Sequence, residues 1–375
     1  MRASRLTVRV CALGLALAAL ALPGQAPAEP VAVIGEAGDG AGHALAAPRG
    51  LALDAQGNLY VAGFLSDNVF RVSRSGKVEL VAERKGDGAS NPLRKPRSLA
   101  VDAQGNLFVA AEGSNALFRV SPRGKVIVVA GGSGPGAFPL LQRPTHVVVG
   151  PAGEAYVSSP LAGVLRVSRE GPVREVIGRR GDGTHPLQRP NGLAVDARGN
   201  LYVVGAKSNN AFRVSPSGEA VQILDAAGAG PDAKLDFPDA VAVDAAGNVY
   251  VAGNNSGNVL RVGPDGSVRE VVGPKDPRDG SWLGAPSELA LAAGGRLYVA
   301  RMGERALQRL EPDGVARTVL EETGPDGRRR LRMARGLAID AAGNVYVAGM
   351  GSHNVLKIPA RALEPAPATP AGGKP

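Results

Sequence analysis

The chain has 375 residues and a formal net charge of +9, from 43 lysines and arginines against 34 aspartates and glutamates. This mild positive bias favours anionic partners only weakly, and without a recognisable DNA-reading helix the sequence predicts no nucleic-acid binding. The single cysteine, Cys11, excludes a fold held by disulfides. No hydrophobic run is long enough for a transmembrane helix, so we expect no transmembrane anchor.

The first 28 residues have the pattern of a cleaved signal peptide. Arg2, Arg5 and Arg9 form a basic start, an apolar run follows at 11–22, and Ala-Pro-Ala at 26–28 supplies a small-x-small cleavage pattern. Its loss would take the formal charge from +9 to +6, because three arginines and no acids are removed. We therefore expect a protein exported to the periplasm or the extracellular space.

Seven copies of one sequence unit follow. The first copy reads PRGLALDAQGNLYVAG, and successive copies begin 46 or 48 residues apart. Each unit reads as four short strands, in which Asp-x-x-Gly-Asn forms the first hairpin. Such units predict an all-β fold, a β-propeller of seven four-stranded blades. The units begin at Pro48, Pro96, Pro144, Pro190, Pro238, Pro286 and Ala334.

The two ends of the repeat array complement each other. The seventh unit stops at 354–360 without a fourth strand, whereas residues 31–47 look like a fourth strand and its loop. Pairing of the N-terminal strand with the last blade would close the ring and leave no open sheet edge. We therefore predict one propeller domain over residues 29–361, most simply a monomer. A Pro/Ala-rich tail over 362–375 is expected to be disordered.

Two positions of the repeat are best explained by architecture. One aromatic residue recurs in every unit and predicts packing between blades. The hairpin aspartate is replaced by Gly150 and Ala292 in the third and sixth units, which indicates a turn support and not a ring of catalytic carboxylates. The recurring aromatic residues are Tyr60, Phe108, Tyr156, Tyr202, Tyr250, Tyr298 and Tyr346.

The segment AKLDFPDAVAVDAAGNVYVAGNNSGNVLRVGPDG, at 233–266, resembles an NHL-repeat unit, as do the loops GDGASNPL (86–93) and GDGTHPL (181–187). The resemblance covers roughly residues 31–360. Strand three carries Asn-x-hydrophobic-Arg-Val where the family has its Asn-His-Leu signature, and so is closer to the streptogramin-lyase-like propellers. Many NHL propellers have six blades, which is the alternative to the seven counted here. The resemblance implies the fold, but its members include protein-binding modules, sensor ectodomains and a few enzymes.

Propeller ligands usually bind at the mouth of the central channel. We call "mouth face" the face built from the loops that lead into strand one and those that join strands two and three. The residue or two after each repeat start should line this mouth. Blades seven, one and two supply arginines there, and blades three to six supply polar or acidic groups, so we predict a polarised binding site. Its residues are Arg49, Arg97, His146, Asn191, Asp239, Glu288 and Arg335.

Two metal sites are conceivable. Asn191, Asp239 and Glu288 could hold Ca²⁺ in the channel, because carboxylate and amide oxygens suit that ion. The alternative is that these side chains are solvated or pair with the arginines and hold no metal. The resemblance includes amidating lyases, which suggest Zn²⁺ as a second metal. Three further histidines on the mouth face are candidate ligands, although nothing in the sequence sets the distances between them. They are His43, His185 and His353.

The predicted function is a non-enzymatic binding scaffold with its ligand on the mouth face. Basic runs at 83–85, 93–97, 179–180 and 328–332 lie in loops of this face, so a protein, a glycan or another anionic ligand is the expected partner. The competing hypothesis is a metal-dependent lyase or lactonase-like hydrolase at the channel mouth. There His146 would be the catalytic base.

Overall fold

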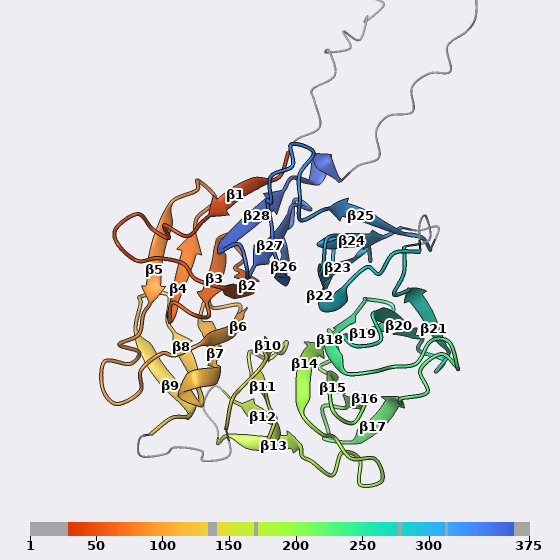
Figure 1. The fold of residues 1–375 in the computed structure, drawn as a ribbon. Coiled ribbons are helices and arrows are strands. Elements are labelled where there is room, and N and C mark those ends of the chain that lie inside the picture. The colour runs from red at the N-terminus through yellow and green to blue at the C-terminus, as the bar shows by residue number, and fades with distance from the viewer. Residues whose placement is uncertain (1–28, 134–140, 169–171, 277–279, 312–313, 364–375) are drawn as a thin grey trace, which may run out of the picture.

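The structure is a computed structural model that describes residues 29–133, 141–168, 172–276, 280–311 and 314–363. The predicted signal peptide at 1–28 and nearly all of the predicted tail lie outside the described residues. The described strands form seven four-stranded antiparallel sheets, arranged as blades around a central axis (Figure 1). The prediction of a seven-bladed propeller is therefore confirmed.

The first four blades follow the chain in order, each from its inner to its outer strand. Blade one contains β2 (Pro48–Leu53), β3 (Leu59–Gly63), β4 (Asn68–Val72) and β5 (Val78–Ala82). Blade two contains β6 (Pro96–Val101), β7 (Leu107–Ala111), the short helix η1 (Glu112–Ser114), β8 (Ala116–Val120) and β9 (Val126–Gly131). Blade three contains β10 (Val147–Val149), β11 (Ala155–Ser159), β12 (Gly163–Val167) and β13 (Arg174–Ile177). Blade four contains β14 (Pro190–Val195), β15 (Leu201–Gly205), β16 (Asn210–Val214) and β17 (Ala220–Leu224).

The remaining blades complete the ring. Blade five contains β18 (Pro238–Val243), β19 (Val249–Gly253), β20 (Asn258–Val262) and β21 (Val268–Val272). Blade six contains β22 (Ala285–Leu291), β23 (Leu297–Met302), β24 (Leu307–Leu310) and β25 (Ala316–Leu320). Blade seven contains β26 (Ala334–Ile339), β27 (Val345–Gly349), β28 (Asn354–Ile358) and β1 (Val31–Ile34), and the short helix η2 (Ala360–Ala362) follows.

The ring closes between the two ends of the chain. Strand β1 pairs antiparallel with β28, with Val31 opposite Lys357 and Ala32 opposite Leu356. In Figure 1 the red N-terminal strand accordingly lies beside the blue last blade. This pairing supplies the fourth strand that the seventh repeat lacks, as the sequence predicts.

A hydrogen bond from a backbone N–H to the side chain of a loop residue in the left-handed conformation joins successive blades. Asn115 accepts from the backbone N–H of Arg143 at 2.9 Å, and Asn209 accepts from that of Phe237 at 2.9 Å. Blade one uses Asp67 in the same way. At the closing seam, His353 Nδ1 accepts from the backbone N–H of Ala47 at 3.1 Å. His353 therefore has a structural partner where the ring closes.

The recurring aromatic residues pack between blades, as predicted. Each belongs to a buried cluster with strands of the following blade, and Tyr202 of blade four, for example, packs with Val251 and Leu260 of blade five. The hydroxyl group of Tyr202 also donates to Asp196 at 3.1 Å, which ties the ring to the hairpin of its own blade. The core is therefore a series of seven inter-blade layers and not one central cluster.

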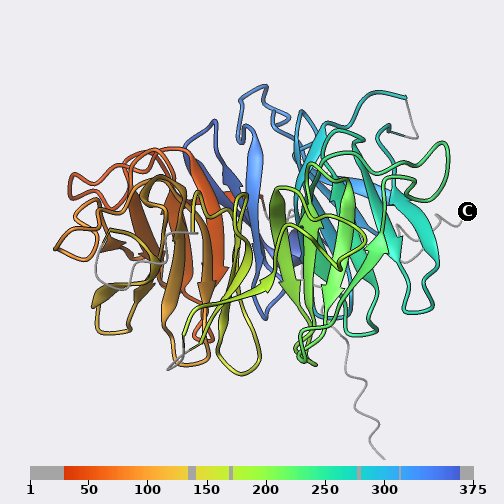
Figure 2. The same cartoon turned by 90° about the horizontal axis from the view of Figure 1, so that it is seen from below.

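The inner strands approach each other closely near the mouth face. A Cβ atom at Gly336 would lie 2.0 Å from the carbonyl oxygen of Arg49, and one at Gly50 would lie 2.8 Å from that of Arg97. Only glycine fits such contacts, and the close packing holds the preceding residue of each strand at the mouth. Figure 2 shows the ring from the side, with strands running between two loop-covered faces. None of the helices in the described ranges has the length and apolar character to cross a membrane.

Candidate functional site at the channel mouth

The structure gathers the seven predicted mouth residues at the starts of the inner strands. Six of them line one cavity of about 170 Å³, to which every blade except the fourth contributes a polar or charged side chain. Asn191 of blade four is buried beside it. The six residues that line the cavity are Arg49, Arg97, His146, Asp239, Glu288 and Arg335.

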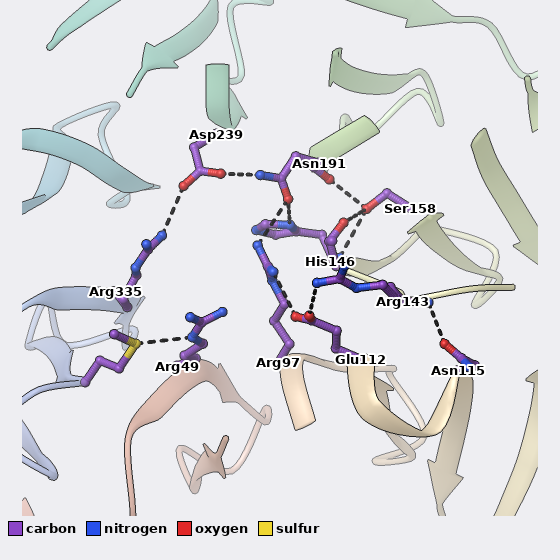
Figure 3. A network of polar contacts seen from close by, with 12 residues as sticks. Arg49, Arg97, Glu112, Asn115, Arg143, His146, Ser158, Asn191, Asp239 and Arg335 are labelled. Atoms are coloured by element: carbon purple, nitrogen blue, oxygen red, sulfur yellow. Dashed lines mark hydrogen bonds and ion pairs between the residues drawn. The ribbon is translucent and has the colours of Figure 1, made fainter. Parts of the chain in front are cut away.

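Asn191 stands at the centre of a polar chain across the mouth (Figure 3). Its Nδ2 donates to Asp239 Oδ1, and Arg335 Nη1 donates to the other carboxylate oxygen at 3.1 Å. On its other side, Asn191 Oδ1 lies 3.1 Å from His146 Nδ1 and accepts from Arg97 Nη2 at 3.5 Å. Blades two, three, four, five and seven are thereby linked.

The direction of the Asn191 amide determines the hydrogen positions on His146. Because Nδ2 faces the Asp239 carboxylate, Oδ1 is the acceptor in the contact with His146, and His146 must carry its hydrogen on Nδ1. The Nε2 atom of the neutral ring is then an acceptor. It lies 3.9 Å from Glu288 Oε2, so two acceptors face each other across a distance longer than a hydrogen bond.

A buried serine positions His146. The hydroxyl group of Ser158 accepts from the backbone N–H of His146 at 3.1 Å and donates to the carbonyl oxygen of Asn191 at 2.7 Å. Ser158 is fully buried. Sequence reasoning missed it, although other blades have alanine at this position, as at Ala252 and Ala348. A polar residue at one otherwise apolar repeat position was the available signal.

Glu112, at the start of η1, is the second residue that sequence reasoning missed. Its carboxylate pairs with Arg97 at 3.0 Å and with Arg143 at 2.8 Å. Burial raises the pKa of Glu112, but the hydrogen bonds and charges of the two arginines outweigh it and hold the pKa below its usual value. The equivalent residues elsewhere are uncharged, as at Phe64 and Pro160, so this acid too departs from the repeat.

Arg49 also lines the cavity but, unlike Arg97 and Arg335, takes part in none of these ion pairs. Its Nε donates to the sulfur of Met350 at 3.3 Å, and its guanidinium group lies 4.0 Å from the centroid of the Phe64 ring. Among the described residues no carboxylate pairs with it. Figure 3 shows Arg49 between Arg335 and Arg97. Burial, and then the like charges of these two arginines, lower the pKa of Arg49 to about 10, so it is cationic at neutral pH.

The candidate calcium ligands do not form a cation cage. Asn191 turns its NH₂ group toward Asp239, and Arg335 occupies the second oxygen of that carboxylate. In the part of the chain that the structure describes, no group of three or more His, Cys, Asp or Glu side chains could hold a metal ion. Asn191 and Asp239 thus contact Arg97 and Arg335, as in the alternative, whereas Glu288 forms no ion pair with an arginine among the described residues.

The three further histidines do not meet at a zinc site either. His43 Nδ1 lies 2.8 Å from Asp39, and His185 Nδ1 lies 3.0 Å from Asp182, so each pairs within its own loop. His353 binds the backbone at the closing seam. The geometry therefore does not bring the candidate zinc ligands His43, His185 and His353 together.

A larger groove of about 710 Å³ lies between blades one and two at the hairpin face, opposite the mouth. Its two aspartates are engaged in turns, and its Glu79 pairs with Arg71 and Lys77. Asp54 accepts from the backbone N–H of Asn58 at 2.8 Å, and Asp102 accepts from that of Asn106 at 2.8 Å. Since this groove offers no comparable unpaired charge among the described residues, the mouth is the better candidate site.

No protein-family model matches the sequence, and no curated protein matches it significantly, so membership of the NHL-repeat family is not shown. Selenomethionine-substituted virginiamycin B lyase from Staphylococcus aureus is similar in structure, with 13% identity and a TM-score of 0.66 over 88% of this chain and 97% of that chain. The chain shares its fold with seven-bladed propellers of the streptogramin B lyase type.

Two other solved structures show how widely this fold is used. Kuenenia stuttgartiensis hydrazine synthase has 17% identity and a TM-score of 0.62, over 84% of this chain and 96% of that chain. The extracellular domain of a hybrid two component system from B. thetaiotaomicron has 15% identity and a TM-score of 0.66, over 88% of this chain and 43% of that chain. At such identities the similarity establishes the fold alone. An extracellular domain among these structures is compatible with export.

Proposed function

We propose that the chain is an exported, non-enzymatic binding protein that holds an anionic group of its ligand at the channel mouth. The observation that carries this proposal is Arg49, which converges with Arg97 and Arg335 but has no carboxylate partner among the described residues. Arg97 and Arg335 pair with Glu112 and Asp239, and Glu112 also contacts Arg143. One cation therefore stays available in the cavity.

The surroundings of Arg49 suit a carboxylate or a similar anion. A partly buried guanidinium group forms short, charge-assisted hydrogen bonds with two oxygens of one anion. An anion bound there would offset the repulsion that Arg49 receives from its two neighbours. The cavity of about 170 Å³ is smaller than the cavities that enclose drug-sized ligands, so it admits a small molecule or one group of a larger one. A glycan or protein would have to place the rest of its mass on the loops of the mouth face.

A thermal-shift screen tests this proposal. Wild-type protein, Arg49→Met and the control Arg123→Met, an exposed arginine of a β8–β9 turn, would be melted with small carboxylates, sulfate, phosphate and neutral sugars. We expect at least one anion to raise the Tm of wild type and of the control but not of Arg49→Met. Equal shifts in Arg49→Met, or shifts with neutral sugars only, would contradict the proposal.

His146 supports a second candidate function, a lyase or lactonase-type activity at the same mouth. Its Nε2 is an acceptor on the cavity side, held by Asn191 and Ser158, and could remove a proton from a bound substrate. Virginiamycin B lyase among the similar structures makes virginiamycin B a reasonable substrate to assay. Turnover that is lost in His146→Ala but kept in the control His185→Ala would rank this activity above simple binding.

A further inference from the structure

Two of the three arginines that line the mouth cavity have a carboxylate partner within the protein. Arg97 pairs with Glu112, and Arg335 pairs with Asp239. Within the described ranges, Arg49 on β2 has no ion-pair partner. Glu288 on β22 has none either when His146 is neutral. A ligand in this cavity therefore meets both a cation and an anion.

Glu288 has no lysine or arginine partner among the described residues. Its side chain is 28% exposed, it lines the cavity, and within the described ranges its one contact with a charged or titratable group is His146 Nε2 at 3.9 Å. The hydrogen-bond network places a hydrogen of His146 on Nδ1, so in the neutral ring Nε2 presents a lone pair to the carboxylate. A neutral ring in this contact does not compensate the charge of Glu288.

Two acceptors 3.9 Å apart can share one donor group that lies to the side of the line joining them, within hydrogen-bond distance of both. A single N–H group of a typical protein donor satisfies one acceptor, but an ammonium group carries three hydrogens and can donate to Glu288 and to His146 Nε2 together. Its positive charge would neutralise the carboxylate. A purely anionic ligand would instead bring a second negative charge into a small cavity beside Glu288, where the repulsion is poorly screened.

We infer that the ligand at the mouth is a small zwitterion of the α-amino acid type, with its carboxylate on Arg49 and its ammonium group between Glu288 and His146. This inference rests on the proposed function, because it needs a ligand anion on Arg49. Strands β2 and β22 belong to blades one and six, which are separated by blade seven, and both residues line the same cavity. The ligand thus bridges the two groups across a volume of about 170 Å³.

Calorimetric titration with matched ligands tests the inference. Wild-type protein would be titrated with the twenty common α-amino acids. The tightest would then be compared with its deaminated acid and its decarboxylated amine. We expect each of these fragments to bind about tenfold more weakly or worse, which is the usual effect of losing one charged hydrogen bond.

Two variants separate the contributions of the ligand groups. Glu288→Gln should weaken the binding of the amino acid, and should strengthen that of the deaminated acid because the repulsion from the Glu288 carboxylate is removed. Arg49→Met should abolish the binding of both. The control Arg123→Met should change neither.

The outcomes distinguish this inference from the function on which it rests. If the deaminated acid binds wild type as tightly as the amino acid, and binding still depends on Arg49, the zwitterion is wrong and the anion site stands. If no amino acid binds but other anions bind through Arg49, the zwitterion is again wrong and the anion site stands. If nothing binds through Arg49, both proposals are wrong.

Discussion

Asn191 donates its side-chain amide to Asp239, and this hydrogen bond sets the direction of the contacts across the channel mouth. It turns Asn191 Oδ1 toward Arg97 and His146, which in turn places the hydrogen of His146 on Nδ1. Because Asn191 is buried, its two polar atoms depend on these partners and not on water. Asn191 therefore orients the side chains that surround it at the mouth.

Asn191→Asp should destabilise the protein at neutral pH. The substitution places a second carboxylate against Asp239, and we expect a loss of about 1–3 kcal/mol in the free energy of unfolding, partly recovered on acidification as the pair shares a proton. Urea denaturation at several pH values measures this effect, with Asn191→Ala as the variant that lacks the added charge. Wild-type stability of Asn191→Asp at neutral pH would contradict the assigned contact.

The hairpin aspartate Asp340 should contribute stability that acid removes. Burial raises the pKa of Asp340, but hydrogen bonds from the side chain and backbone of Asn344 and from Tyr346 outweigh it, and the pKa is lowered. A carboxyl group whose pKa is lowered by folding stabilises the protein above its unfolded pKa of about 4, and this stability is lost as the pH falls through the folded value. Asp340→Ala, which copies Ala292 of blade six, should therefore lose stability at neutral pH and flatten the decline between about pH 5 and pH 3.

Denaturation as a function of pH measures this decline. Asp232→Ala is the control, because Asp232 is an exposed aspartate of a loop outside the hairpins. An acid limb as steep in Asp340→Ala as in wild type would show that this carboxyl group does not couple folding to pH.

The closing seam should tolerate asparagine in place of His353. Asn115 and Asn209 make the equivalent bond at other blade junctions, so His353→Asn should keep the bond to the backbone of Ala47. His353→Ala should lose about 0.5–1.5 kcal/mol of unfolding free energy. Thermal melts of the two variants check this order, and equal destabilisation of both would show that the hydrogen bond to Ala47 contributes little.

Arg301 should be essential for the loop that leads into blade six. Its fully buried guanidinium group donates to the carbonyl oxygens of Gly257, Gly273 and Gly284, and burial lowers its pKa to about 10. Arg301→Ala should cost about 3 kcal/mol or more, because several buried carbonyls lose their donor. Trp282, the only tryptophan and 56% exposed, lies in this loop and reports on it by fluorescence.

The control for Arg301 is Arg296→Ala, an exposed arginine of the same blade. We expect the control to leave both the melting temperature and the tryptophan spectrum unchanged. If the two variants are equally stable, the carbonyl contacts of Arg301 do not hold the loop.

The fold was predictable because every repeat carries the same information. The spacing of Pro48 and its equivalents, the hairpin pattern and the recurring aromatic residues each indicate the same four-stranded unit. The missing fourth strand of the last repeat pointed to its closure by β1, which the structure confirms. Agreement among these local signals left few alternatives to a propeller of seven blades.

The set of residues at the mouth was also predictable, but their pairing was not. The position after each repeat start placed Arg97 and Asp239 at the mouth, whereas their partners depend on side chains brought together only by the ring. Glu112 and Ser158 could not be predicted from what the repeats share. Both stand where one copy departs from the others, and such departures are where a repeat protein can build a site.

A crystal structure of the protein saturated with the tightest ligand from the two screens tests the central claim most directly. The account predicts the ligand in the channel-mouth cavity, with its carboxylate within hydrogen-bond distance of the terminal nitrogens of Arg49. A ligand bound in the hairpin-face groove between blades one and two, or on the outer loops with Arg49 uncontacted, would contradict it.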